Sequence, residues 1–89
     1  MNYFMIRHKI ENFNKWKPEY DDSLSLRKTA GLKEVFLLHN LDNPNEIVLL
    51  FEASDIAKAK KFSTSPELKE KMQKAGVLGP PDIVFLSDK

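Results

Sequence analysis

The uninterrupted apolar run at residues 47–51 (IVLLF) restricts the fold of this chain more than any other segment. A strand with one solvent-facing side alternates apolar and polar residues, and this run does not alternate. Because successive side chains of a strand point to opposite faces, the first, third and fifth residues of the run would cover one face of a sheet, and the other two its opposite face. Both faces of this strand therefore need cover.

Three further segments have the composition of strands. Residues 3–10 combine apolar and basic side chains, and residues 33–40 and 83–86 are again apolar at consecutive positions. Turn-forming residues at 41–45 separate the second strand from the run at 47–51, so these two strands are predicted to form a hairpin.

A helical region is predicted between the first two strands, because apolar side chains recur there at intervals of three and four residues. This stripe consists of Phe13, Trp16, Tyr20 and Leu24. Asn12 or Asn14 is expected to cap the start of the helix, since a short polar side chain accepts hydrogen bonds from the first-turn amides. Gly31 is the expected stop.

A second helical region is predicted before the last strand, with Ser54 or Asp55 as its cap. It is interrupted at Ser63-Thr64, and Ser65-Pro66 restarts it as a cap followed by a proline at the first helical position. Gly76 is expected to end it. Residues 79–81 (GPP) are interpreted as a stiff, extended connector to the last strand.

The order strand, helix, strand, strand, helix, strand predicts an α+β, ferredoxin-like βαββαβ fold. Right-handed crossovers then place both helices on one face of a four-stranded antiparallel sheet. The whole chain, residues 1–89, is expected to form a single domain. The strands carry apolar residues on both faces, and a bare apolar sheet face is larger than a monomer normally exposes. We therefore expect a homodimer that associates through the helix-free sheet face.

The composition argues against several classes of protein. With 14 basic and 13 acidic residues the net charge is +1, which is not the basic excess of a nucleic-acid-binding protein. There is no cysteine, so disulfides and thiol chemistry are excluded. No apolar run approaches the roughly 20 residues of a membrane helix, and the N-terminus lacks the apolar core of a signal peptide. We expect a soluble, cytoplasmic protein that does not bind membranes.

Two histidines are the side chains that would titrate near neutral pH. His8 and His39 each end a strand, on the core-facing parity, so each is either a satisfied structural histidine or a proton-transfer group at the rim of a pocket. His8 is the preferred acid/base candidate. Arg7 is the candidate that holds an anionic group, and the alternative is an ion pair with Glu34 or Glu52.

Other candidate residues surround a predicted ligand pocket. Trp16 and Tyr20 lie four residues apart on one helix face, where they either pack in the core or line the pocket. His39 and Asn40 are further pocket candidates. No metal site is predicted, because the chain contains neither the His-x-His nor the Glu-x-x-His spacing.

The chain also resembles a known group of proteins, the dimeric α+β barrel superfamily, and within it the antibiotic-biosynthesis-monooxygenase-like proteins and small cyclase-like bacterial proteins of unknown function. The segments that carry this resemblance are residues 7–11 (RHKIE), 13–18 (FNKWKP), 42–46 (DNPNE), 65–69 (SPELK), 76–77 (GV) and 79–81 (GPP).

The resemblance implies a dimer of ferredoxin-like protomers but no single activity, since the superfamily includes cofactor-free oxygenases, haem-degrading enzymes, isomerases and regulators. Its cofactor-free oxygenases use an apolar pocket with a tryptophan and an asparagine, roles for which Trp16 and Asn40 are the candidates here. One hypothesis is a cofactor-free monooxygenase-like or cyclase-like enzyme that acts on a small aromatic or polyketide-like compound. The alternative is a non-catalytic ligand-binding or structural dimer.

Overall fold

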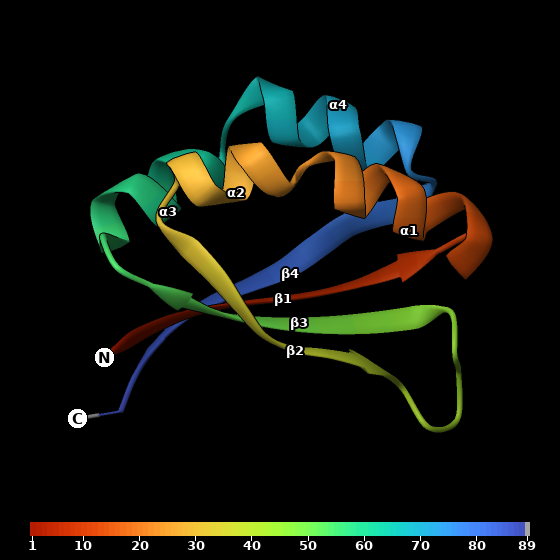
Figure 1. Cartoon of the computed structure of the whole chain (residues 1–89). Helices are drawn as coiled ribbons and strands as arrows, with labels where there is room; N and C mark the ends of the chain where they lie inside the picture. Colours follow the sequence, from red (N-terminus) through yellow and green to blue (C-terminus); the bar gives the residue numbers. More distant parts are fainter. Residues whose placement is uncertain (89) are drawn as a thin grey trace.

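The computed structural model describes residues 1–88, which form one four-stranded antiparallel sheet covered by helices on one face (Figure 1). The elements in chain order are β1 (Asn2–Ile10), α1 (Phe13–Asp22), α2 (Leu24–Thr29), β2 (Leu32–His39), β3 (Glu46–Ala53), α3 (Ile56–Ser63), α4 (Pro66–Lys74) and β4 (Val77–Ser87). The strand order β2-β3-β1-β4 places β1 and β3 in the centre of the sheet. The predicted α+β ferredoxin-like fold is confirmed.

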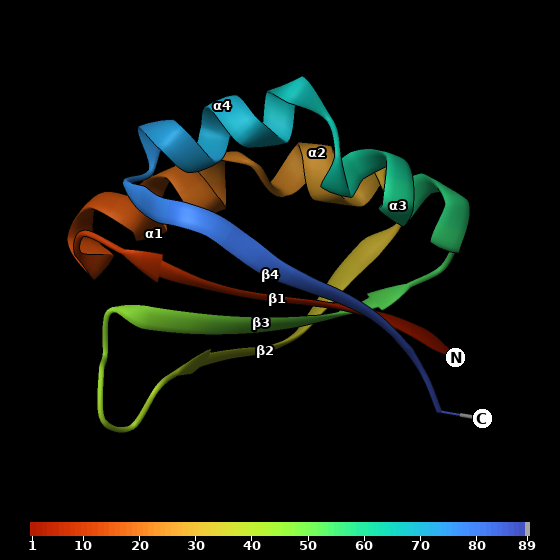
Figure 2. The same ribbon diagram turned by 180° about the vertical axis from the view of Figure 1, so that it is seen from behind.

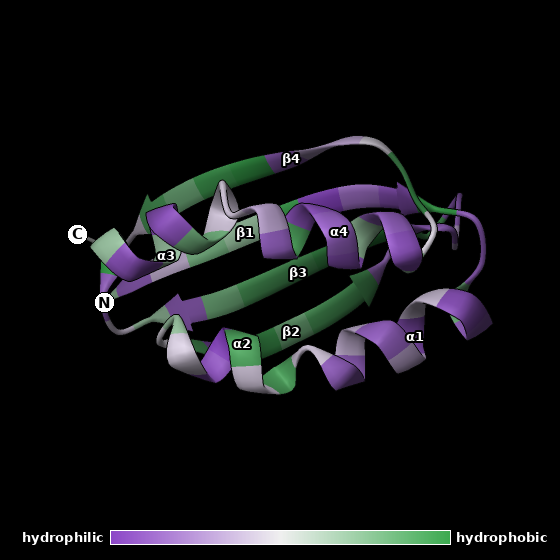
Figure 3. Ribbon diagram, turned by 90° about the horizontal axis from the view of Figure 1, so that it is seen from above, coloured by the Kyte–Doolittle hydropathy of each residue, from purple (hydrophilic) through white to green (hydrophobic). Residues whose placement is uncertain are grey.

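The hydrophobic core lies between the sheet and the helix layer. Alternate residues of the two central strands are buried, namely Phe4, Ile6, His8 and Ile10 in β1 and Ile47, Leu49, Phe51 and Ala53 in β3. Trp16 of α1 and Ala59 of α3 are also buried, on the helix side of this core. Viewed from above the helices, apolar residues follow the strands, whereas the helices are mainly hydrophilic (Figure 3). Packing of a one-sided helix layer onto a sheet therefore forms the core.

Side chains predicted as caps are found at the starts of three helices. The first predicted helical region is divided into two helices. Asn12, Asp55 and Ser65 are the observed caps, and each side chain accepts from a first-turn amide. The expected first helix is divided, because Ser23 ends α1 and its side chain donates to the Glu19 carbonyl at 3.0 Å. The prediction that Leu24 continues the buried stripe is wrong, since Leu24 is 48% exposed.

The last strand is longer than predicted. Residues 79–81, interpreted as a connector, belong to β4, which starts at Val77. Proline removes a backbone donor, so it is tolerated in a strand that lies at the edge of a sheet, as β4 does. The pairing of β1 with β4 also shifts register between Arg7 and Lys9.

A second irregularity lies in the other edge strand, β2. Glu34 is opposite Phe51 and Leu37 is opposite Leu49, so residues three apart in β2 share a face. The register shift between Glu34 and Phe36 accounts for this change and leaves Val35 out of the ladder. Val35, which has no cross-strand partner in this ladder, is 37% exposed.

The helix-free face of the sheet carries an apolar row across all four strands. Phe36, Leu50, Met5 and Val84 are successive cross-strand neighbours in this row. Phe36 is 54% exposed and Val84 is 39% exposed. Seen from either side, no element of residues 1–88 covers this face (Figures 1 and 2). Across the same residues, no helix combines the length and apolar character needed to cross a membrane.

Candidate functional site

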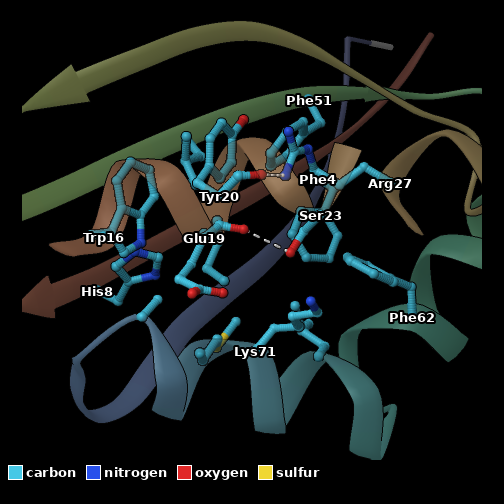
Figure 4. Close-up of a pocket in the computed structure, with 15 residues that line it drawn as sticks. Phe4, His8, Trp16, Glu19, Tyr20, Ser23, Arg27, Phe51, Phe62 and Lys71 are labelled. Atoms are coloured by element: carbon cyan, nitrogen blue, oxygen red, sulfur yellow. Dashed lines mark hydrogen bonds between the residues drawn. The ribbon is translucent and has the colours of Figure 1, made fainter. Parts of the chain in front are cut away.

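A cavity of ≈ 60 Å³ lies between the sheet and the helix layer, and most elements of the fold contribute to its wall. Its apolar lining comes mainly from β1, β3 and α4 (Figure 4). The polar or partly polar side chains that line it are His8, Trp16, Glu19, Tyr20, Ser23, Arg27 and Lys71. The cavity therefore combines a mostly apolar wall with a few titratable groups.

His8 extends from β1 into this cavity and is only 5% exposed. Neither of its ring nitrogens has a hydrogen-bond partner among residues 1–88, and its ring centroid lies 5.7 Å from that of Trp16. Burial lowers the pKa of His8 to about 4, because the apolar surroundings disfavour the charged form. At pH 7 the imidazole is therefore neutral, with one nitrogen able to donate and the other able to accept.

Glu19 of α1 supplies a second unpaired polar atom to the same cavity. Its Oε2 is buried and has no hydrogen-bond partner in the part of the chain that the structure describes. Its Oε1 lies 3.8 Å from Nζ of the exposed Lys74. The sequence analysis missed Glu19, although it lies three residues after Trp16 and therefore on the same helix face.

Three side chains stack to form one wall of the cavity. The rings of Trp16 and Tyr20 are 4.7 Å apart and nearly parallel, and the Arg27 guanidinium carbon lies 3.7 Å from the Tyr20 ring centroid. The Arg27 guanidinium donates to the Tyr20 carbonyl at 2.6 Å, and the Tyr20 hydroxyl donates to Glu34 Oε1 at 2.6 Å. Burial raises the pKa of Tyr20 and lowers that of Arg27. These bonds fix the positions of Tyr20 and Arg27 in the wall.

Arg7 lies on the sheet face opposite His8, because adjacent residues of a strand point to opposite sides. Its guanidinium donates to Asp82 Oδ2, at 2.7 Å from Nη2 and 3.2 Å from Nε. Glu46 Oε1 lies 3.5 Å from its Nε. The ion pair was predicted with Glu34 or Glu52, and the observed partners are different because the register places Arg7 opposite Asp82.

His39 and Asn40 lie outside the cavity, at the hairpin between β2 and β3. His39 is exposed; its Nδ1 is 3.0 Å from the Pro44 carbonyl oxygen, and its ring packs against Phe13. The Asn40 amide donates to Glu46 Oε2 at 2.9 Å, and its Oδ1 accepts from backbone amides of the turn. The structure thus brings His8, Trp16 and Tyr20 together and places Arg7, His39 and Asn40 elsewhere.

Among residues 1–88, no three His, Asp or Glu side chains gather closely enough to hold a metal ion.

No protein-family model matches the chain, and no curated protein matches it significantly. Several solved structures do. A protein from Bordetella bronchiseptica described as a candidate antibiotic biosynthesis monooxygenase shares 13% identity and a TM-score of 0.77, over 99% of this chain and 96% of its own. A mutant of SnoaB, a cofactor-independent oxygenase from Streptomyces nogalater, shares 12% identity and a TM-score of 0.72, over 99% of this chain and 92% of its own.

A third similar structure is an uncharacterised NIPSNAP domain protein from Burkholderia xenovorans, with 15% identity and a TM-score of 0.65, over 100% of this chain and 95% of its own. These comparisons confirm the predicted resemblance at the level of the fold. The chain has the α+β ferredoxin-like fold of antibiotic-biosynthesis-monooxygenase-like proteins. Sequence identities this low establish the fold and not the activity.

Proposed function

We propose that this protein is a homodimeric enzyme that acts on a small aromatic or polyketide-like compound in the His8 cavity, without a cofactor. The observation that carries this proposal is the buried His8 imidazole, whose two nitrogens have no partner among the described residues. A side chain buried only for stability is normally hydrogen-bonded, so an unpaired one is a candidate for binding or catalysis. The similar protein SnoaB is a cofactor-independent oxygenase, and this similarity supports a reaction that needs no cofactor.

The proposed role of His8 is to remove one proton from the substrate. A neutral imidazole accepts a proton from an activated C–H or O–H group and leaves an electron-rich enolate or phenolate. The anion formed beside the ring raises the pKa of His8 above its value of about 4 and stabilises the imidazolium. In an oxygenation the anion then reacts with O2: one oxygen atom replaces two substrate hydrogens, and the other leaves as water. In a cyclisation the anion attacks a carbonyl carbon of the same molecule, the carbonyl π bond breaks, and the resulting alkoxide takes the proton back from His8.

The size of the cavity requires part of its wall to move when substrate enters. Ligand pockets usually measure about 300–1,000 Å³, whereas this cavity measures ≈ 60 Å³. Leu68 and Met72 of α4 line both the cavity and an outer groove of ≈ 770 Å³. Methionine is unbranched and adapts its shape easily. We therefore place the entrance at Leu68 and Met72 rather than at the hydrogen-bonded Tyr20–Arg27 wall.

The dimer proposal rests on the helix-free face. Its apolar row, Phe36, Leu50, Met5 and Val84, would be buried by the same face of a second copy. From the sequence composition, we also propose that the protein is located in the cytoplasm.

The small volume of the cavity favours a second candidate function, a non-catalytic dimer that binds a small ligand or has a structural role. A cavity of ≈ 60 Å³ holds a few water molecules without any change of shape. This alternative predicts that the protein turns over no compound, so replacement of His8 has no catalytic effect.

A matched pair of variants tests the enzyme proposal. Purified protein is incubated with a panel of hydroxylated aromatic and polyketone compounds, while O2 uptake and product masses are followed. His8→Phe is expected to lower turnover by about 100-fold or more, the usual contribution of a general base. His39→Phe is expected to retain turnover, because His39 lies outside the cavity. Equal turnover by His8→Phe and wild type would contradict the proposal. Ligand binding without turnover by the wild type favours the alternative.

A further inference from the structure

We propose that Glu19 is the second polar group of the His8 cavity, and that the two residues select compounds with two hydroxyl groups on one edge of an aromatic ring. This inference rests on the proposed function and gives it a substrate class.

The first support is that both side chains lack a hydrogen-bond partner in the same cavity. His8 is 5% exposed, and its two ring nitrogens and Glu19 Oε2 are the buried side-chain polar atoms for which residues 1–88 supply no hydrogen-bond partner. All three atoms belong to residues that line the same cavity, as Figure 4 shows. A buried polar atom without a hydrogen bond is energetically unfavourable. The cavity therefore brings together three polar atoms that have no hydrogen-bond partner among the described residues.

Ion pairing does not account for the position of Glu19. The nearest cation, Lys74 Nζ, lies 3.8 Å from Oε1, and the Lys74 side chain is 69% exposed. An exposed ion pair of this kind contributes little to stability. The buried oxygen therefore points into the cavity without a structural reason.

The chemistry of the two groups selects the ligand groups that fit. A carboxylate only accepts hydrogen bonds, so Glu19 requires a donor on the ligand. It also repels a ligand carboxylate or phosphate at that position. His8 is neutral at pH 7 and offers an acceptor nitrogen to a second donor. Two adjacent O–H groups satisfy both residues.

Two cations in the wall favour hydroxyl groups over protonated amines. Arg27 and Lys71 line the same cavity. Their positive charges disfavour an ammonium group and favour the partial negative charge of hydroxyl oxygens, most strongly once one hydroxyl has lost its proton to His8.

The ring is assigned from the aromatic wall. The edges of the stacked rings of Trp16 and Tyr20 and the edge-to-face pair of Phe4 and Phe51 line the cavity and offer apolar contacts to a further ring. A planar diol with its hydroxyl edge toward His8 and Glu19 matches both halves of the cavity.

The test compares catechol with its monomethyl and dimethyl ethers by isothermal titration calorimetry, on wild type, Glu19→Gln and Glu70→Gln. Trp16, the single tryptophan of the chain, gives a second signal, since its fluorescence reports occupancy of the cavity. We expect wild type to bind catechol about tenfold or more tightly than the monomethyl ether, as loss of a hydrogen bond to a charged group implies. Glu19→Gln should lose this preference and about tenfold in affinity for catechol. Glu70→Gln, the same change on the exposed side of α4, should behave as wild type.

Three results would overturn the inference: no binding of catechol by wild type, equal binding of catechol and its monomethyl ether, or unchanged catechol affinity in Glu19→Gln. Circular dichroism of each variant checks that it is folded, and Glu19→Asp, which keeps the carboxylate, should retain part of the preference for catechol. The proposed function fails separately. If His8→Phe abolishes turnover and Glu19→Gln has no effect, the enzyme proposal stands and the role of Glu19 is lost. If Glu19 controls diol binding but no compound is turned over, the role of Glu19 stands and the enzyme proposal fails.

Discussion

At the scale of single residues, His8 is the side chain whose environment departs most from what stability alone requires. It is buried in an apolar cavity as a neutral base, and the charged groups around that cavity are Glu19, Arg27 and Lys71. An apolar side chain of similar shape would avoid the cost of the unpaired nitrogens. This combination of burial and missing partners is typical of residues kept for function.

The burial of His8 predicts a pH dependence of stability. Its pKa is about 4 in the folded protein and near 6.5 in the unfolded chain. Between these values the unfolded state binds the proton and the folded state does not, so stability falls as the pH is lowered from about 6.5 to 4, by up to about 3 kcal/mol. His8→Phe should lack this contribution, whereas Glu19, Arg27 and Lys71 are common to both proteins. Urea unfolding at several pH values measures the difference, and parallel pH profiles of wild type and His8→Phe would rule the effect out.

The residue-level predictions from sequence succeeded where strand parity or helix spacing decides the outcome. Parity placed His8 on the core face of β1, and the spacing of four placed Trp16 and Tyr20 together. The same parity argument separates Arg7 from His8, although both were candidate site residues. Glu19 was overlooked because a glutamate on an amphipathic helix is normally a solvated residue, and only the packed structure shows that its Oε2 is buried.

At the scale of elements, the order of strands and helices could be predicted from periodicity and caps, but the irregularities could not. The break after α1 depends on the Ser23 hydroxyl, which competes for the Glu19 carbonyl within the helix. The extension of β4 through Pro80 and Pro81 depends on its place at the sheet edge, which is a property of the assembled sheet. Such features arise from tertiary context, where local propensity has little influence.

Gly31, which ends α2 and leads into β2, is the element boundary that the structure makes most testable. Its φ is +74°, and a Cβ there would lie 2.5 Å from Ser54 Oγ, whose hydroxyl donates to the Gly31 carbonyl. Gly31→Ala is expected to reduce the free energy of unfolding by about 1–2 kcal/mol from the left-handed backbone alone, and further through the contact with Ser54. Thermal and urea unfolding measure the loss.

Gly79→Ala is the control for this prediction. Gly79 has a similar φ of +72°, but an added Cβ would meet no atom within 4 Å. It should therefore show only the backbone contribution. If Gly31→Ala is no more destabilising than Gly79→Ala, the contact with Ser54 has no energetic importance.

At the scale of the whole molecule, the sheet has two apolar faces and one helix layer. The run at residues 47–51 places Leu49 in the covered core, at 3% exposure, and Leu50 in the open row of the helix-free face. Neighbouring residues in one strand therefore report on two different events, folding of the protomer and the proposed association of two protomers. The sequence predicts that both faces of this strand are covered. Whether the helix-free face is covered depends on the oligomeric state.

Leu49→Asp and Leu50→Asp separate these two events. A charge at Leu49 would be buried without a partner, so Leu49→Asp is expected to abolish cooperative folding, seen as loss of the thermal transition by circular dichroism. A charge at Leu50 stays hydrated in a lone protomer but is buried in the proposed dimer. Leu50→Asp should therefore remain folded and sediment as a monomer under conditions in which wild type sediments as a dimer. Because Leu50 lies between Phe36 and Met5 in the apolar row, the substitution affects the centre of the proposed interface. A wild-type protein that sediments as a monomer, or a Leu50→Asp variant that still forms the dimer, would show that the helix-free face is not the surface of association.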